Sequence, residues 1–228
     1  ERYHTGNFVL GIRGDLNEKE AVRLGEKYFG EMTRGAPLRV EPAIPIQKSV
    51  IRQVLKPFTQ STLQINIAAS SPQDSRYPHY RIVSTILRNR LNQRLRHREH
   101  LAYSAGANLY ELADSSVYRL YIETAAEQLP RAYGSIQSEL RHLPGSLTEE
   151  ELRRAKSRVK ANIVFDEDRS DIDRAMFETL FYGGVVPIEE IVESLESAEL
   201  EDIKKLAEEI ITRPQRTLII ANSEVHLT

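Results

Sequence analysis

Eight consecutive residues, 62–69, alternate between polar and apolar side chains and constrain the fold more than any other stretch. The apolar positions are Leu63, Ile65, Ile67 and Ala69, and the polar positions between them are Thr62, Gln64 and Asn66. This period of two is that of a β-strand that buries one face and exposes the other. The chain must therefore provide neighbouring strands and a layer that covers the apolar face. With 228 residues, 40% of them apolar, it is long enough to do so.

The other predicted strands and helices are grouped along the chain. Strands are expected at residues 50–56, 103–112, 117–125 and 216–222, with a polar turn at 113–116 between the middle two. Helices are expected at about 78–99, 127–142, 148–166, 169–182, 187–197 and 201–211. Strands in one block and helices in another predict an α+β fold, with an antiparallel β-sheet covered by helices.

The first 34 residues carry a predicted strand and helix of their own. Residues 7–14 have the pattern of a strand, and Asn17 lies three residues before Glu20, the spacing of a capping box that opens a helix. The last predicted strand, 216–222, resembles 7–14 in length and apolar content. This similarity suggests two related domains that each close with such a strand, and the alternative is a pair of unrelated edge strands.

Residues 35–48 contain three prolines and little periodicity, which is typical of a linker. We therefore divide the chain into a strand–helix remnant of a preceding domain (1–34), a linker (35–48) and an α+β domain (49–228). The chain opens at Glu1 rather than at methionine, and we expect it to be a piece of a longer polypeptide.

Composition excludes several classes of function. The chain has no cysteine, so thiolate zinc sites, disulfides and cysteine nucleophiles are ruled out. Its formal net charge of −2 argues against a dedicated nucleic-acid binder. No apolar run approaches the roughly 20 residues that a membrane span needs, so we expect a soluble chain. These features leave the compartment open, and the bacterial cytoplasm and periplasm are both compatible.

Residues 97–100, His97-Arg98-Glu99-His100, are the stretch that most resembles a metal site. On a helix, His97 and His100 would lie on a shared face, and imidazoles are zinc ligands. The helical zinc-peptidase patterns HExxH and HxxEH place their histidines four apart, however, and a catalytic zinc needs a third protein ligand. We therefore expect two surface histidines near a helix C-terminus and no metal site.

Five arginines lie between residues 88 and 98, and Arg90, Arg94 and Arg98 form a stripe with a spacing of four. Such a stripe can contact phosphates, but no RNA-binding motif or row of aromatic side chains accompanies it. We interpret it as a solvated face whose arginine stems lie over apolar surface. The three glutamates at 149–151 are expected to stabilise the dipole of the helix that they begin.

Four stretches together match a family pattern in the right order. They are NFVLGIRGDLNEKEAVRLGEKYFGEM, SSPQDSRYPHYRIVSTIL, RLRHREHLAYSA and LTEEELRRAKSRVKANIVF. The third resembles RLREKxGLAYSV, which ends a long helix in the pitrilysin/insulinase (inverzincin) family of zinc metallopeptidases, and the fourth resembles the TxEEL-x-x-AK helix of that family. The first is similar to the strand and helix that close the family's zinc-bearing domain, and the second to the loop before its long helix. The resemblance covers most of the chain.

The resemblance implies a division of labour between two halves that enclose a chamber. Members of the family are built from homologous α+β domains, and one half carries HxxEH and zinc. The other half lacks metal and supplies an arginine and a tyrosine, seven residues apart, which fall here on Arg96 and Tyr103. Zinc is then expected in an HxxEH-bearing partner half, in the same polypeptide or in another subunit. His97 and His100 depart from the pattern, because they stand where the family has acidic and glycine-like residues.

In this role Arg96 and Tyr103 would hold the backbone of a peptide substrate near the scissile bond. Arginine is a permanent cation with a fork of donors for a peptide carbonyl or the oxyanion that develops on it, and tyrosine adds a donor on a rigid ring. Taken alone, the pair would be a surface residue at a helix end and a core aromatic. The chain by itself is not expected to hydrolyse peptides.

Two other functions remain open from the sequence. The first is a non-proteolytic scaffold or assembly subunit, which keeps the fold but does not use the arginine and tyrosine. An HxxEH motif upstream in the full-length sequence would favour the peptidase over this alternative. The second is an unrelated interaction module, which a comparison of folds would expose.

Overall fold

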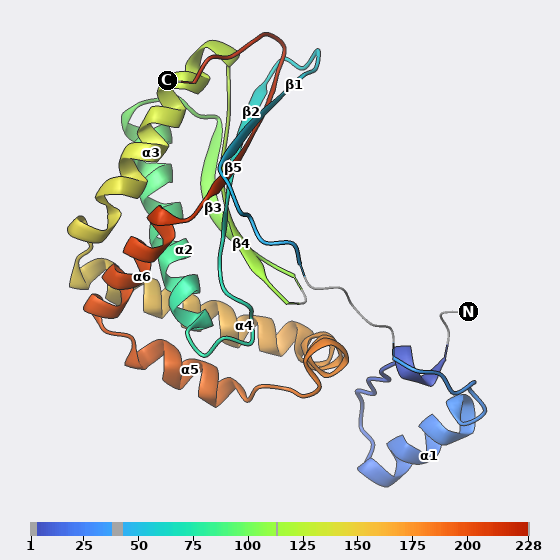
Figure 1. The fold of residues 1–228 in the computed structure, drawn as a ribbon. Helices are drawn as coiled ribbons and strands as arrows, with labels where there is room; N and C mark the ends of the chain where they lie inside the picture. The colour runs from blue at the N-terminus through green and yellow to red at the C-terminus, as the bar shows by residue number, and fades with distance from the viewer. Residues whose placement is uncertain (1–3, 38–42, 113, 228) are drawn as a thin grey trace. The chain divides into compact units, whose positions relative to one another are not determined.

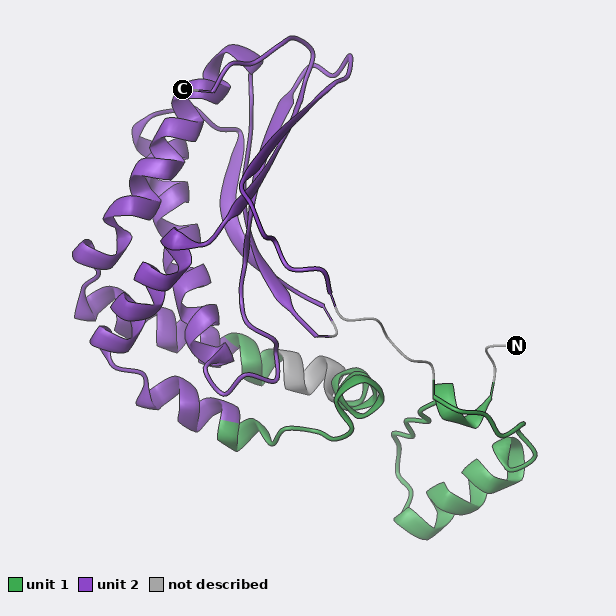
Figure 2. Ribbon diagram, viewed as in Figure 1, with its two compact units in different colours: residues 1–42, 162–190 green, residues 43–161, 191–228 purple. Residues whose placement is uncertain are grey.

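The structure is a computed structural model that describes residues 4–37, 43–112 and 114–227, without the side chains of 166–171. Residues 38–42 of the expected linker and Ala113 of the expected turn lie outside this description. The chain divides into two compact units (Figure 2). One unit comprises residues 1–42 with 162–190, and the other comprises 43–161 with 191–228.

The larger unit is built on a five-stranded sheet in the order β1-β5-β2-β4-β3. The strands are β1 (Val50–Leu55), β2 (Ser61–Ala68), β3 (Ser104–Glu111), β4 (Ser116–Thr124) and β5 (Gln215–Ala221). Three of the pairings are antiparallel, whereas β1 and β5 are parallel. The α+β class is confirmed, but the sheet is mixed rather than purely antiparallel. The reason is that the chain returns after its helices and inserts β5 between β1 and β2.

The alternation of 62–69 produces the expected one-sided burial. Leu63, Ile65 and Ile67 of β2 are fully buried, and they pair across the ladder with buried residues of β4. Three helices lie over this apolar face (Figure 1): α2 (Tyr77–Leu91), α3 (Leu129–Ser146) and α6 (Leu200–Thr212). The core of the larger unit is therefore the layer between the sheet and these helices.

The remaining helices differ from expectation in one respect. A single helix, α4 (Glu149–Tyr182), takes the place of the two helices expected at 148–166 and 169–182. No glycine or proline lies between the two ranges to end the helix. Helix α5 (Ile188–Ser197) follows near its expected position. None of the helices in the described part of the chain has the length and apolarity that a membrane crossing requires.

The smaller unit holds helix α1 (Glu18–Phe29), which the predicted capping box begins: Asn17 Oδ1 accepts from the Glu20 N–H at 3.0 Å. The strand expected at 7–14 is not formed. Phe8 has an extended backbone (φ −129°, ψ 131°), but residues 8–12 pair with no strand in the described chain. The segment packs its Phe8 ring against Phe29 of α1, with 5.5 Å between the ring centroids. An extended segment without a neighbouring strand cannot form a ladder, whatever its sequence pattern.

Candidate functional site

The long helix α2 changes its winding before it ends. Residues Asn92–Arg98 continue α2 as a π-helix, η2, and the Glu99 N–H closes it by donating to the Arg94 carbonyl at 2.9 Å. Leu95 is fully buried within this turn and fixes it to the core. A helix was predicted to run to about residue 99, but its sequence carries no signal for π-winding. Such turns are rare and often lie at functional sites.

Arg96 projects from η2 and Tyr103 lies one residue before β3. Both side chains are exposed, Tyr103 to 71%, and neither makes a side-chain hydrogen bond or an ion pair in the described part of the structure. No hydrogen bond or ring contact joins the two. Their backbone is held more firmly, because the Tyr103 N–H donates to the Glu123 carbonyl of β4 at 3.1 Å. The structure therefore presents a free guanidinium and a free phenol on an anchored backbone.

The short segment between these residues is anchored at Leu101. This residue is 5% exposed, its N–H donates to the Leu95 carbonyl at 2.8 Å, and its carbonyl accepts from the Thr124 hydroxyl. One residue earlier, His100 has φ 53°, in the left-handed region that favours glycine. The resemblance places a glycine-like residue here, so His100 adopts the turn of that residue at a cost of about 1 kcal/mol.

His97 and His100 are both exposed near the end of the helix. They do not share a helical face, because η2 ends at Arg98 and His100 lies beyond it in the left-handed turn. Across residues 4–37, 43–112 and 114–227, no three side chains of the histidine, aspartate or glutamate type gather where they could hold a metal ion. The donor set that zinc requires is thus missing from the described residues.

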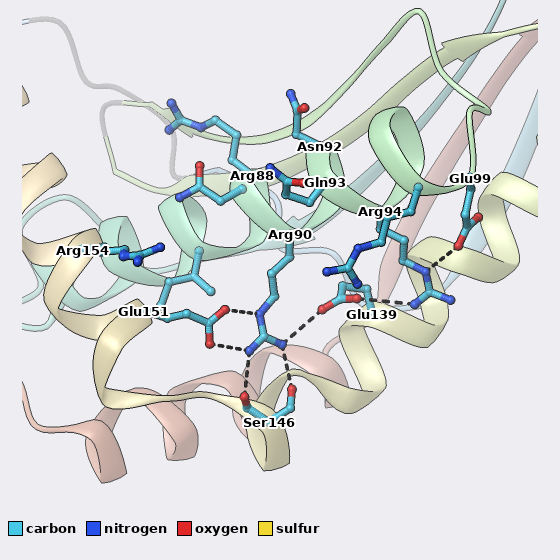
Figure 3. A pocket seen from close by; sticks show the side chains of 13 residues that line it. Arg88, Arg90, Asn92, Gln93, Arg94, Glu99, Glu139, Ser146, Glu151 and Arg154 are labelled. Atoms are coloured by element: carbon cyan, nitrogen blue, oxygen red, sulfur yellow. Dashed lines mark hydrogen bonds and ion pairs between the residues drawn. The ribbon is translucent and has the colours of Figure 1, made fainter.

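Two arginines of the predicted stripe are joined to carboxylates rather than solvated (Figure 3). The Arg90 guanidinium forms a bidentate pair with Glu151, with both N···O distances 2.7 Å, and also donates to Glu139 at 3.2 Å. Glu139 accepts from Arg94 at 3.4 Å, and the Nε of Arg94 donates to Glu99 at 2.8 Å. We call these five residues the arginine–glutamate chain. It connects α2 and η2 to α3 and to the first turn of α4.

The outcome for the other predicted charges is mixed. Arg98 is exposed and has no hydrogen bond or ion pair among the described residues, as expected of a solvated face. For Arg90 and Arg94 this expectation is wrong. Glu151 lies in the first turn of α4 and forms a capping box with Thr148, but the helix dipole alone does not explain its role, because it also binds Arg90. Since 61 residues separate Arg90 from Glu151, no local spacing could have revealed this pair.

Burial and hydrogen bonding act against each other on these carboxylates. Burial raises the pKa of Glu99, but hydrogen bonds from Ser135 and Arg94 outweigh it and the pKa of Glu99 lies below its ordinary value. The pKa of Glu151 is also lowered, because the Arg90 guanidinium outweighs its burial. Hydrogen bonding to Glu151 raises the pKa of Arg90. Glu99 and Glu151 therefore carry their negative charge at neutral pH, opposite the arginines that bind them.

A cleft of about 980 Å³ opens beside this chain of charges, within the larger unit (Figure 3). Its lining contains five arginines and three glutamates, including the arginine–glutamate chain and Arg98. Most of these groups neutralise one another. Neither Arg96 nor Tyr103 lines the cleft, so it is separate from the predicted substrate-binding pair.

Comparison with known proteins agrees with this architecture. Residues 1–159 match the family described as "Peptidase M16 inactive domain", which covers more than half of the chain. The chain therefore belongs to this family of zinc metallopeptidases and is an inactive domain of it, as the resemblance to pitrilysin and insulinase predicted.

Relatives and solved structures support the assignment. The chain is 24% identical to an uncharacterised zinc protease of Rickettsia felis over 99% of its own length and 56% of the relative. It is 22% identical to the mitochondrial-processing peptidase subunit beta of Caenorhabditis elegans, over 98% and 54%. Its fold is similar to the crystal structure of a peptidase M16 inactive domain from Pseudomonas fluorescens, with a TM-score of 0.84 and 17% identity over 99% of this chain and 56% of that one. The chain spans about half the length of these relatives.

Proposed function

We propose that this chain is the substrate-binding half of a zinc metalloendopeptidase, in which Arg96 and Tyr103 clamp the peptide backbone beside a zinc that another half carries. The observation that carries the proposal is the contrast between fixed backbone and free side chains at these two positions. Leu95 and Leu101 are buried and the Tyr103 N–H is bonded to β4, while the Arg96 and Tyr103 side chains have no partner among the described residues. Donors held in this way can meet a ligand without first breaking other bonds.

The chemistry of the two groups fits a peptide in an extended conformation. The Arg96 guanidinium offers several N–H donors and a permanent charge to a peptide carbonyl or to an oxyanion. The Tyr103 hydroxyl provides one more donor, and its ring offers an apolar surface to a substrate side chain. Such donors accelerate a reaction when they meet charge that develops in the transition state. Activation of water is left to the partner half, because the described residues lack a zinc-ligand set.

The partner is an HxxEH-bearing zinc half, in the same polypeptide or in another subunit. The lengths of the relatives support this, because nearly half of each extends beyond the matched region. A similar protein is named a subunit of mitochondrial-processing peptidase, and a protein of that name has at least one other subunit. Zinc is accordingly a cofactor of the assembled enzyme rather than of this chain.

Residues 8–29 support the proposal that residues 1–34 belong to a preceding domain, although the smaller unit also contains residues 162–190, which the proposed boundaries place in the α+β domain. Helix α1 is strongly amphipathic and yet contains no buried residue. Phe8, Leu10 and Ile12 are each 40% exposed, and the backbone of residues 8–12 makes no hydrogen bond within the described chain. An apolar extended segment with unpaired N–H and C=O groups is suited to joining the edge of another sheet. That sheet would belong to the preceding domain.

A scaffold role is the second candidate, and one comparison favours it. The fold is similar to a chain of the structure titled "Complex III2 from Candida albicans, Inz-5 bound", with a TM-score of 0.81 and 15% identity over 92% of this chain and 54% of that one. A chain with this fold is therefore part of that complex. In such a role Arg96 and Tyr103 would not contact a peptide.

A peptidase assay on the full-length protein with its zinc-bearing half distinguishes the two roles. Arg96→Ala and Tyr103→Phe should each lower turnover about a hundredfold, since removal of one donor to developing charge typically has that effect. Arg98→Ala is the matched control, because Arg98 is also exposed and unpaired in the described chain. If both variants turn over peptide like the parent and the control, the clamp is wrong. If the assembled protein turns over no peptide, the scaffold role takes its place.

A further inference from the structure

Glu99 lies between Arg96 and Tyr103 and is more firmly bound than either. Its carboxylate accepts from Arg94 Nε at 2.8 Å and from the Ser135 hydroxyl of α3 at 2.6 Å. Its own N–H donates to the Arg94 carbonyl and so closes the π-helical turn that carries Arg96. The side chain is 19% exposed. A single residue thus joins the end of the long helix to the helix packed beside it.

Apart from the buried side chains of Leu95 and Leu101, the segment is held through hydrogen bonds of its own main chain. Leu101 bonds to Leu95 and accepts from Thr124, and the Tyr103 N–H bonds to Glu123 of β4. These bonds fix the two ends of the segment. Between them the backbone reverses at His100, in the left-handed region. Glu99 is the side chain that ties this reversal to α3 directly, through Ser135.

We propose that Glu99 is a positioning residue for substrate binding: its carboxylate bridges Arg94 and Ser135 and thereby holds Arg96 and Tyr103 at a fixed separation. The inference rests on the proposed clamp function and deepens it. Two donors seven residues apart grip an extended peptide only if the turn between them keeps its shape. A displacement of about 1 Å at a reacting group can lower a rate about a hundredfold. Glu99 can therefore affect turnover without contacting the substrate or the zinc.

The choice of Glu99 over its neighbours follows from the contacts. Glu151 holds Arg90, a full turn and more before Arg96, and so fixes the packing of α2. Glu139 binds Arg90 and also Arg94 of η2, but it has no bond to the residues between Arg96 and Tyr103. His97 and Arg98 lie closer to Arg96 but are exposed, without hydrogen bonds or ion pairs among the described residues. Glu99 is the member of the arginine–glutamate chain that reaches the segment carrying the clamp.

The test uses the full-length protein with its zinc-bearing half and a double-mutant cycle. Glu99→Ala should lower kcat at least tenfold in the parent and leave kcat unchanged in an Arg96→Ala/Tyr103→Phe background, because an orienting residue has no effect once the groups it orients are gone. Its effect on stability should be equal in both backgrounds. Hydrogen exchange at the amides of residues 99–103 should become faster. Ser135→Ala, which removes one of the two anchors, should shift kcat and exchange in the same direction by a smaller factor.

The control is Glu150→Gln, since Glu150 also accepts from two arginines, Arg153 and Arg154, but on the exposed first turn of α4. It should leave kcat and the exchange of residues 99–103 at the parental level. If Arg96→Ala lowers kcat and Glu99→Ala either leaves kcat unchanged or lowers it equally in both backgrounds, the clamp stands and the positioning role is overturned. If Arg96→Ala itself leaves kcat at the parental level, the proposed function fails first, and the positioning role fails with it.

Discussion

Arg90 and Arg96 lie six residues apart on one continuous helix and have opposite surroundings. Arg90 is 16% exposed, and its guanidinium binds two carboxylates and both the hydroxyl and the carbonyl of Ser146. Arg96 is exposed and makes no side-chain hydrogen bond in the described structure. The same residue type therefore serves packing at one position and remains available to a ligand at the other. What differs is whether another element of the fold supplies a carboxylate.

The change of winding between the two arginines explains part of this difference. In a regular α-helix a spacing of four keeps side chains on one face, so Arg90, Arg94 and Arg98 would share a stripe. The π-helix η2 takes in extra backbone from Asn92 onward and shifts the later residues around the axis. Arg94 still reaches Glu139, but Arg98 does not. The stripe that the sequence presents is thus divided into a paired part and a free part.

The largest expected effect is on the free energy of unfolding when Arg90, the arginine that is paired with carboxylates, is removed. Arg90→Ala should lower the free energy of unfolding by about 3 kcal/mol, because it leaves Glu151 half-buried without its cation and leaves Glu139 with Arg94 alone. Arg98→Ala, the free arginine, should change it by less than about 0.5 kcal/mol. Urea unfolding of both variants beside the parent measures the difference. Equal destabilisation by the two substitutions would show that the arginine–glutamate chain does not stabilise the fold.

The same groups give stability a defined pH dependence. Burial alone would raise the pKa of Glu99 and of Glu151 above the ordinary value of 4.5. Hydrogen bonds outweigh burial, from Ser135 and Arg94 to Glu99 and from Arg90 to Glu151, so both pKa values lie below 4.5. Because the unfolded chain binds protons at higher pH than the folded one, this stabilisation is complete above pH 4.5 and is lost as the pH falls below it. We expect a loss on the order of 1 kcal/mol for each carboxylate in urea unfolding at decreasing pH.

Glu151→Gln provides the check on this interpretation. The variant should be less stable than the parent at pH 7, and its stability should decline less steeply below pH 4.5, since one of the titrating groups is gone. A decline as steep as that of the parent would assign the acid sensitivity to other carboxylates.

Much of the fold follows from local sequence, and the exceptions share a cause. The alternation of 62–69 fixes β2, and the Asn17–Glu20 spacing begins α1, because these signals involve neighbouring residues only. The parallel pairing of β5 with β1 and the binding of Arg90 to Glu151 depend on residues far apart in sequence. The strand expected at 7–14 failed for the related reason that a strand needs a neighbour, which no local pattern guarantees.

The candidate site divides in the same way. Arg96 and Tyr103 were placed by the resemblance of RLRHREHLAYSA to a family pattern, and spacing alone did not distinguish them from ordinary surface and core residues. Glu99 has no sequence signal that distinguishes it, because it lies inside a stretch that resembles a metal site. The observation that gives it a role is the Ser135 hydroxyl, 36 residues away on α3. Only the packed structure brings these groups together.

A smaller effect is expected at the turn between the two candidate residues. His100→Gly should raise the free energy of unfolding by about 0.5 kcal/mol, because relief of the left-handed strain exceeds the entropy that glycine adds to the unfolded chain. His97→Gly is the matched control. It lies inside η2 and should instead destabilise by about 1 kcal/mol. Thermal or urea unfolding decides the sign, and a destabilised His100→Gly would mean that the imidazole makes a contribution of its own.

The smallest expected effect on the free energy of unfolding is at Arg96 and Tyr103, whose side chains make no hydrogen bond in the described structure. Arg96→Ala and Tyr103→Phe should leave the free energy of unfolding within about 0.5 kcal/mol of the parent, since neither side chain has a hydrogen-bond partner among the described residues. The prediction is informative because the same two substitutions are expected to lower turnover strongly in the assembled enzyme. A residue that serves the fold loses stability when it is removed, whereas a residue reserved for a ligand loses only binding or rate. If urea unfolding instead shows a loss of 2 kcal/mol or more for either variant, about as much as breaking a hydrogen bond to a charged group, then that side chain has a structural partner. The contrast between Arg90 and Arg96 would then be one of degree.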